Sequence, residues 1–180
     1  MSRDGLVRKE FRLLAKLGLI TALIGIIGYY LWLIPAIVLV ERESGKVVYR
    51  QDTRVGREFT LRFLHSYDQG WVEETYQVKD HRRFVLSAHR FQVVSYDARD
   101  QTYPGDFSLD QEGFVRITNI ARYQEVIFSN LLVRVASIVP QYLETEGSSI
   151  ALGELVPGGY LLVLKIVPIP RILKIYDLRP

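Results

Sequence analysis

The sequence predicts a mainly β protein, an antiparallel sandwich or small barrel preceded by one N-terminal transmembrane helix. Two observations support this: residues 17–40 contain no charged side chain, and about ten short segments after residue 35 alternate apolar and polar residues between Gly and Pro turns. We therefore expect a cytoplasmic basic N-terminus over 1–12, a transmembrane helix over 13–34, an extracytoplasmic β domain over 35–170 and a C-terminal strand or interfacial tail over 171–180.

The composition excludes several classes of protein. Charged residues make up 24% of the 180, too many for a polytopic membrane protein. The absence of cysteine excludes a disulfide framework, a thiolate nucleophile and Cys-based metal sites. A net charge of +3 is too mild to indicate a nucleic-acid partner. We expect no cofactor.

The apolar run is long enough to span a bilayer. Residues 13–34 would rise roughly 33 Å as a helix, against a hydrocarbon thickness of about 30 Å. Pro35 is expected to end the helix, because proline disfavours helical geometry at the preceding residue. A cleaved signal peptide is the alternative, but its apolar core would be shorter and would end in small residues, whereas this run ends near Tyr29, Tyr30 and Trp32.

Charge asymmetry predicts the direction of insertion. Cations and aromatic residues at opposite ends of the run place the N-terminus in the cytoplasm and the β domain outside it. Arg42, Lys46 and Arg50 follow the run and reduce this bias. The cations that precede it are Arg3, Arg8, Lys9, Arg12 and Lys16.

Four small residues share one face of the expected helix. Gly18, Thr21, Gly25 and Gly28 recur at steps of three, four and three. Such a face lets a second helix approach closely, either a copy of this chain or another membrane subunit. The structural alternative is that glycine is simply frequent in transmembrane helices.

The β domain is expected to consist of short antiparallel strands. Residues 59–65 and 71–78 each alternate with period two and read as a hairpin, and the tail 171–180 reads as an edge strand in preference to an interfacial segment. The remaining strand candidates are 36–40, 47–49, 84–88, 91–96, 107–109, 114–118, 126–128, 131–136, 142–145, 149–152 and 160–167.

The predicted hairpin contains four residues that are candidates for a binding site or for fixing the strand register: His65, Ser66, Glu74 and Tyr76. His65 and Glu74 fall on the same face and are expected to lie opposite each other, as a structural ion pair or as the acid and base of a hydrolase. Ser66 follows His65 directly and points to the other face, so a Ser-His nucleophile is not predicted. Glu74, Tyr76 and Val78 share a face. The chain has three histidines, His65, His81 and His89, and their spacing along the sequence does not match that of metal ligands. We therefore expect no metal site.

The chain resembles a bacterial domain family of unknown function. The resemblance covers about residues 36–167 and rests on FTLRFLHS at 59–66, VEETYQV at 72–78, LVRV at 132–135 and LGELVPG at 152–158. Family members commonly have a Gly-rich segment where this chain has VSYDA at 94–98. These small envelope proteins are often encoded beside tripartite ATP-independent periplasmic (TRAP) transporters, especially those with the TAXI type of solute receptor.

The resemblance implies an accessory role near such a transporter. Together with the predicted anchor and external β domain, it leads us to expect a non-enzymatic accessory protein in the bacterial inner membrane. Its expected partners are the lipid bilayer, the transporter membrane subunit and the solute receptor. Two alternatives stay open. One is a structural or assembly module of the envelope that self-associates as a homo-oligomer, through the transmembrane helix or through β-edge pairing. The other is an envelope hydrolase using His65 and Glu74.

Overall fold

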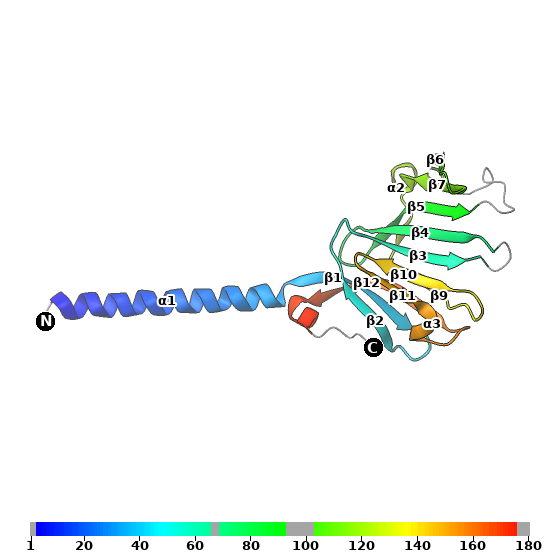
Figure 1. Ribbon diagram of the computed structural model, residues 1–180. Coiled ribbons are helices and arrows are strands. Elements are labelled where there is room, and N and C mark those ends of the chain that lie inside the picture. Colours follow the sequence, from blue (N-terminus) through cyan, green and yellow to red (C-terminus); the bar gives the residue numbers. More distant parts are fainter. Residues whose placement is uncertain (1–2, 66–68, 93–102, 176–180) are drawn as a thin grey trace. The chain divides into compact units, whose positions relative to one another are not determined.

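The computed structural model describes residues 3–65, 69–92 and 103–175, with side chains described between residues 16 and 173 of these ranges. The chain divides into two compact units. A helical unit comprises residues 1–33 and 169–176, and a β unit comprises 34–168 and 177–180. Figure 1 shows the order of their elements along the chain.

The helical unit contains α1 (Arg3–Leu31) and the 3-10 helix η2 (Arg171–Ile175). The two meet where the backbone N–H of Arg171 donates to the carbonyl of Trp32 at 3.0 Å. The Arg171 guanidinium also lies 4.3 Å from the centre of the Tyr29 ring, within cation–π range. The prediction of an edge strand is therefore wrong for residues 171–175. Pro168 and Pro170 cannot donate to a ladder, which favours the end of the preceding strand here.

The predicted transmembrane segment 13–34 is not one element. The helix ends at Leu31 and strand β1 (Leu33–Glu41) begins two residues later, so Pro35 lies inside a strand. The Pro35 carbonyl accepts a hydrogen bond from the N–H of Thr53 at 2.9 Å, and the ladder between β1 and β2 begins one residue later, at Ala36. Pro35 has no N–H to donate, so this position at the end of the ladder suits it. Across the parts of the chain that the structure describes, no helix is both long and apolar enough to cross a membrane.

The strands of the described residues form two antiparallel sheets. The smaller sheet has the order β2-β1-β12-β9, and the larger has the order β11-β10-β3-β4-β5-β7-β6 with β8 paired to β5. The mainly β prediction is confirmed, and two open sheets fit a sandwich and not a closed small barrel. Besides β1, the strands are β2 (Val47–Asp52), β3 (Glu58–Leu64), β4 (Trp71–Val78), β5 (Phe84–Gln92), β6 (Asp106–Leu109), β7 (Phe114–Thr118), β8 (Ile127–Phe128), β9 (Asn130–Arg134), β10 (Gln141–Thr145), β11 (Ser148–Ala151) and β12 (Leu161–Pro170).

Two short helices complete the β unit, α2 (Ile120–Tyr123) and α3 (Leu152–Leu155). The sequence predicts two strands, over 84–88 and 91–96, whereas residues 84–92 form one continuous strand, β5. Residues 93–96 lie outside the described residues. The register of β5 with β4 shifts between Thr75 and Tyr76, so that Thr75 pairs with Ala88 and Tyr76 with Leu86. Ser87 is therefore the extra residue of a β-bulge.

Side chains from both sheets build one hydrophobic core. Leu39, Leu162 and Leu164 from the small sheet and Phe59 and Phe84 from the large sheet are at most 1% exposed. Burial alternates with period two along β3 and most of β12, whereas β1 is buried continuously from Pro35 to Leu39. Burial of these faces stabilises the pairing of the sheets. The remaining space between the sheets contains the site described below.

Candidate functional site

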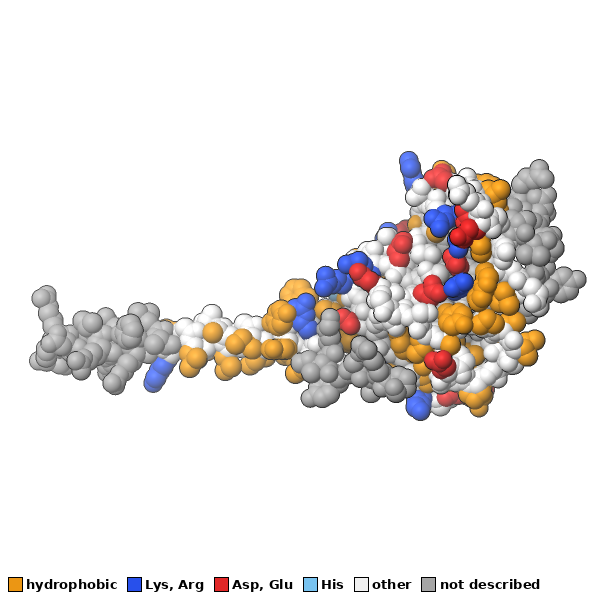
Figure 2. All heavy atoms as spheres, in the orientation of Figure 1, with side chains coloured by type: hydrophobic (Ala, Val, Ile, Leu, Met, Phe, Trp, Pro, Cys, Tyr) orange, Lys and Arg blue, Asp and Glu red, His pale blue; other side chains and the backbone are white. Residues whose placement is uncertain are grey.

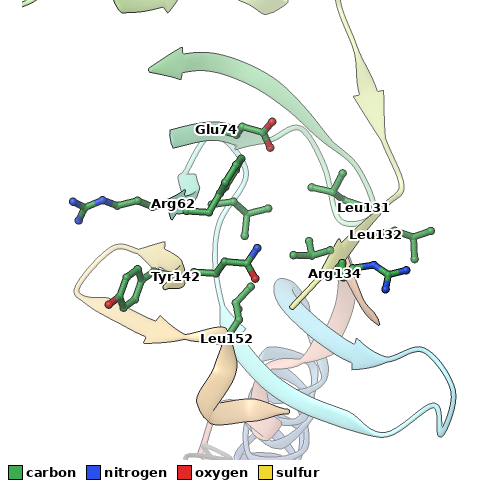
Figure 3. A pocket seen from close by; sticks show the side chains of 11 residues that line it. Arg62, Glu74, Leu131, Leu132, Arg134, Tyr142 and Leu152 are labelled. Atoms are coloured by element: carbon green, nitrogen blue, oxygen red, sulfur yellow. The ribbon is translucent and has the colours of Figure 1, made fainter. Parts of the chain in front are cut away.

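A cavity of about 180 Å³ lies between the two sheets, and Figure 3 shows the side chains around it. Strands β3, β4, β9 and β10 and the start of α3 form its walls. Leu61, Leu131 and Leu152 contribute apolar surface, whereas the side chains of Arg62 and Tyr142 extend away from the space (Figure 3). The cavity is thus apolar over most of its wall.

Glu74 supplies a carboxyl group to this apolar wall. It lies on β4 opposite Leu61 of β3, and its side chain is half-buried. The Tyr76 hydroxyl, two residues along the same face, donates a hydrogen bond of 2.7 Å to the Glu74 Oε2 atom. Burial raises the pKa of Glu74, and the hydrogen bond from Tyr76 offsets part of this rise. A carboxyl group in this setting can hold a proton or a donor group of a bound molecule.

His89 lies beside Glu74 on the next strand, β5, where the two residues are direct register partners. The imidazole is only 7% exposed and packs against the rings of Phe91 and Tyr103, with centroids 5.1 and 5.6 Å away. Burial lowers the pKa of His89 to about 4, so the ring is neutral near pH 7. Within the described residues its Nδ1 atom has no hydrogen-bond partner.

Tyr76 completes this inward-facing group. It is 2% exposed, and its ring stacks on Phe59 with centroids 5.4 Å apart. Burial, followed by the charge and the hydrogen bond of Glu74, raises the pKa of Tyr76 and keeps its hydroxyl protonated as a donor. The cluster is called the Glu74 cluster below and comprises Glu74, Tyr76, His89 and Tyr103.

The predicted pairing of His65 with Glu74 is wrong, although the hairpin itself is confirmed. Strand β3 ends at Leu64, which pairs with Trp71, and the backbone N–H of His65 donates to the carbonyl of Gly70 at 2.8 Å. His65 therefore lies beside the connection between the strands, while Leu61 occupies the position opposite Glu74. His65 and Glu74 are therefore not positioned opposite each other, as the acid and base of the hydrolase alternative would require. Ser66 lies outside the described residues.

The cavity wall itself offers little for covalent chemistry. None of its described lining residues is Ser, Thr, Cys, Lys or His. Likewise, no group of three or more His, Cys, Asp or Glu side chains within the described ranges lies close enough to hold a metal ion.

The predicted small-residue face occurs on α1. A Cβ atom added at Gly18, Gly25 or Gly28 would meet nothing within 4 Å among the described atoms. The Thr21 hydroxyl donates to the carbonyl of Leu17 at 3.0 Å, so its polar group is satisfied inside the helix. The face is therefore open to another helix, which leaves its predicted role untested.

Sequence reasoning missed His89 as the neighbour of Glu74. Strict alternation from Phe84 and Leu86 would turn His89 toward solvent, but the extra residue Ser87 reverses the alternation beyond it. The signal that could have revealed this was Phe91, which lies two residues after His89 and therefore on the same face of the strand. A phenylalanine is expected to face the core, and Phe91 is buried.

Comparison of the chain with protein-family models, with curated proteins and with solved structures finds no match.

Proposed function

We propose that this protein is a membrane-anchored, non-enzymatic accessory protein whose β unit is displayed on the extracytoplasmic side, in association with a solute transporter of the TRAP type. The single observation that carries the proposal is the large apolar surface that α1 leaves uncovered. Figure 2 shows these side chains gathered along the described part of the helix. The following residues are between 42 and 72% exposed: Leu17, Leu19, Ile20, Leu23, Ile24, Ile26, Ile27, Tyr29, Tyr30 and Leu31.

Water is a poor environment for such a surface. Covering one Leu or Ile side chain is favourable by about 1.5–3 kcal/mol, and soluble monomers rarely expose contiguous patches of this kind. Helical hydrogen bonds satisfy the backbone, and the bond from Thr21 to Leu17 satisfies the hydroxyl. A bilayer that received the helical residues 17–31 would therefore cover apolar groups without leaving these polar groups unpaired.

The ends of the apolar segment support the proposed orientation. Basic residues dominate positions 1–16, and the aromatic pair Tyr29 and Tyr30 lies at the other end with an edge-to-face contact of 5.6 Å. The guanidinium of Arg171 lies over Tyr29, an aromatic–cation contact that suits a membrane interface, although this cation reduces the charge asymmetry between the two ends. We accordingly propose the bacterial inner membrane, with the N-terminus in the cytoplasm.

The open face of Gly18, Thr21, Gly25 and Gly28 is the proposed contact with the transporter membrane subunit. The identity of that partner rests on the resemblance to envelope proteins encoded beside such transporters. A homo-oligomer through the same face is the competing assembly.

The anchoring is tested with introduced cysteines, because the natural chain has none. Ser2→Cys and Ser149→Cys are expressed in cells and treated with a membrane-impermeant maleimide before and after permeabilisation of the inner membrane. We expect alkaline extraction to leave the protein in the membrane pellet. The maleimide should label the Ser149→Cys variant before permeabilisation of the inner membrane. It should label the Ser2→Cys variant only after permeabilisation. Release at alkaline pH, or equal labelling of both sites, would contradict the proposal.

The association is tested by crosslinking in native membranes followed by purification of the full chain. We expect transporter subunits to be recovered with the natural chain and to be lost with Gly25→Leu. The control Ile27→Leu, on the opposite side of the helix, should retain them. Recovery of only a second copy of this chain would favour the self-associating module instead.

A further inference from the structure

The outer face of the eight-stranded sheet contains a second hollow, on the opposite side from the Glu74 cluster. It has a volume of about 460 Å³. Strands β4, β5 and β7 form its floor, and α2 contributes a wall through Ala121 and Arg122. We call this hollow the outer groove.

The outer groove exists because of local irregularities in both floor and wall. The β-bulge at Ser87 places small side chains, Thr75, Ser87 and Ala88, side by side at the centre of the floor. The wall begins at Asn119, a non-glycine residue with φ of 57°. Asparagine tolerates this left-handed conformation better than most non-glycine residues, which lets the chain turn sharply into α2.

Asp106 of β6 holds this wall in place. One carboxylate oxygen accepts from the Asn119 side-chain amide at 2.6 Å, and the other accepts from the Tyr123 hydroxyl at 2.5 Å. These hydrogen bonds, with a smaller contribution from Arg122, hold the pKa of Asp106 below its usual range, so it is ionised near neutral pH. Both oxygens are thus already engaged, and Asp106 forms no ion pair with Arg122 among the described residues.

The groove contains two arginines, Arg116 and Arg122, that form no ion pair within the described residues. Arg116 is the direct cross-strand neighbour of Arg90, an arrangement of like charges that is unfavourable by itself. Arg90 is compensated by Glu73 at 3.1 Å, Asp110 at 3.0 Å and Glu112 at 2.8 Å. Neither Arg116 nor Arg122 forms an ion pair with any residue that the structure describes, and both are exposed.

We infer that the outer groove binds a small hydroxylated carboxylate, with Arg116 and Arg122 holding the carboxylate and the small polar residues of the floor holding its hydroxyl groups. Guanidinium groups recognise carboxylates through paired N–H donors. Glu58 and Glu73 also line the groove, and their charges oppose a doubly charged anion such as phosphate.

The floor explains why the ligand should carry hydroxyl groups. Ser87 donates toward Glu58 at 3.1 Å, and Thr75 shares a hydrogen bond of 3.1 Å with Thr60. The Ser87 hydrogen has two acceptors within the protein, the Glu58 carboxylate and the Thr75 carbonyl, so the Ser87 oxygen acts toward a ligand as an acceptor. The Thr75 hydroxyl can donate when it accepts from Thr60. A ligand group that both donates and accepts, such as a hydroxyl, matches this set. This inference does not depend on the membrane anchoring or on the partner proposed above.

The experiment uses the full chain in mild detergent and titrates it with glucuronate by calorimetry. Glucose lacks the carboxylate, acetate lacks the hydroxyl groups, and phosphate carries more charge, so each serves as a comparison. We expect saturable binding of glucuronate and much weaker binding of the other three. Equal binding of acetate or phosphate, or no binding of glucuronate, would overturn the inference.

Variants then locate the site. Arg116→Gln and Arg122→Gln should each weaken glucuronate binding by about tenfold or more, because each removes one charge-assisted contact. Ala88→Leu should block the groove without changing its charge. Arg54→Gln removes one exposed cation outside the groove and should bind like the natural chain. Binding that is unaffected by the first three variants, or equally weakened by Arg54→Gln, would show that the groove is not the site.

Discussion

Glu74 and His89 are direct register partners on β4 and β5, on the side of the sheet that faces the core. Burial acts on them in opposite directions, because it disfavours the charged form of each: the pKa of Glu74 rises and that of His89 falls to about 4. Burial therefore opposes the charged form of both members of the pair. The protonation of the pair should be visible in the pH dependence of folding.

His89 should make the fold sensitive to acid. Its pKa is about 4 in the folded chain against 6.5 for an ordinary histidine, so the unfolded chain binds more protons between these values. Stability should fall by about 3 kcal/mol as pH drops from 6.5 to 4. Glu74 acts with the opposite sign, since its raised pKa favours the folded state at low pH and this contribution disappears as pH rises through its folded pKa.

The measurement is urea unfolding of the natural chain and of His89→Phe across this pH range. Glu74 is common to both chains, so the difference between them reports His89. We expect His89→Phe to lose less stability in acid. Parallel pH curves would show that His89 is protonated without cost in the folded chain.

Tyr76→Phe should destabilise the fold through Glu74. The substitution removes the hydroxyl that donates to Glu74 at 2.7 Å and leaves a half-buried carboxyl without that donor, at a cost of about 1–3 kcal/mol. In the Glu74→Leu background the same substitution should cost much less. A double-mutant cycle by denaturant unfolding gives the coupling, and simple additivity would contradict it.

Arg90→Lys should be costly for a conservative change. Arg90 bridges Glu73, Asp110 and Glu112 and lies 3.7 Å over the Phe114 ring, a geometry that a single ammonium group cannot reproduce. We expect a loss of about 1–2 kcal/mol in unfolding free energy.

The matched control for Arg90→Lys is Arg83→Lys. Arg83 pairs with Asp80, but its side chain is 50% exposed. Its replacement should change the unfolding free energy by less than about 0.5 kcal/mol. Equal effects of the two substitutions would mean that the Arg90 network contributes no more than a surface pair.

Gly158→Ala should destabilise the turn before β12. A Cβ at Gly158 would lie 2.4 Å from the Ser137 Cα, so the backbone would have to move, at a cost of about 1–3 kcal/mol. Gly153→Ala is the control, because a Cβ there meets nothing within 4 Å of described atoms and the residue lies in α3. Thermal unfolding should separate the two variants, and similar melting temperatures would refute the predicted clash.

Much of the fold follows from local sequence. Alternation over 59–65 and 71–78 was sufficient to predict the β3–β4 hairpin, because side chains on a strand alternate with period two whatever the rest of the chain does. Gly147, with φ of 77°, marks a turn that a side chain would oppose. The C-terminal end of the helix was predicted three residues too late, because β pairing begins at residue 33 although residues 32–34 are apolar and compatible with a helix.

The sequence by itself therefore determined the strands, most turns and the mainly β class. Only the tertiary structure decided which residues meet across strands. The hairpin register moved His65 out of reach of Glu74, and one extra residue at Ser87 turned His89 inward and opened the outer groove on the other face. A bulge shifts every later side chain to the opposite face, and its position depends on pairing with a neighbouring strand, which local periodicity does not encode.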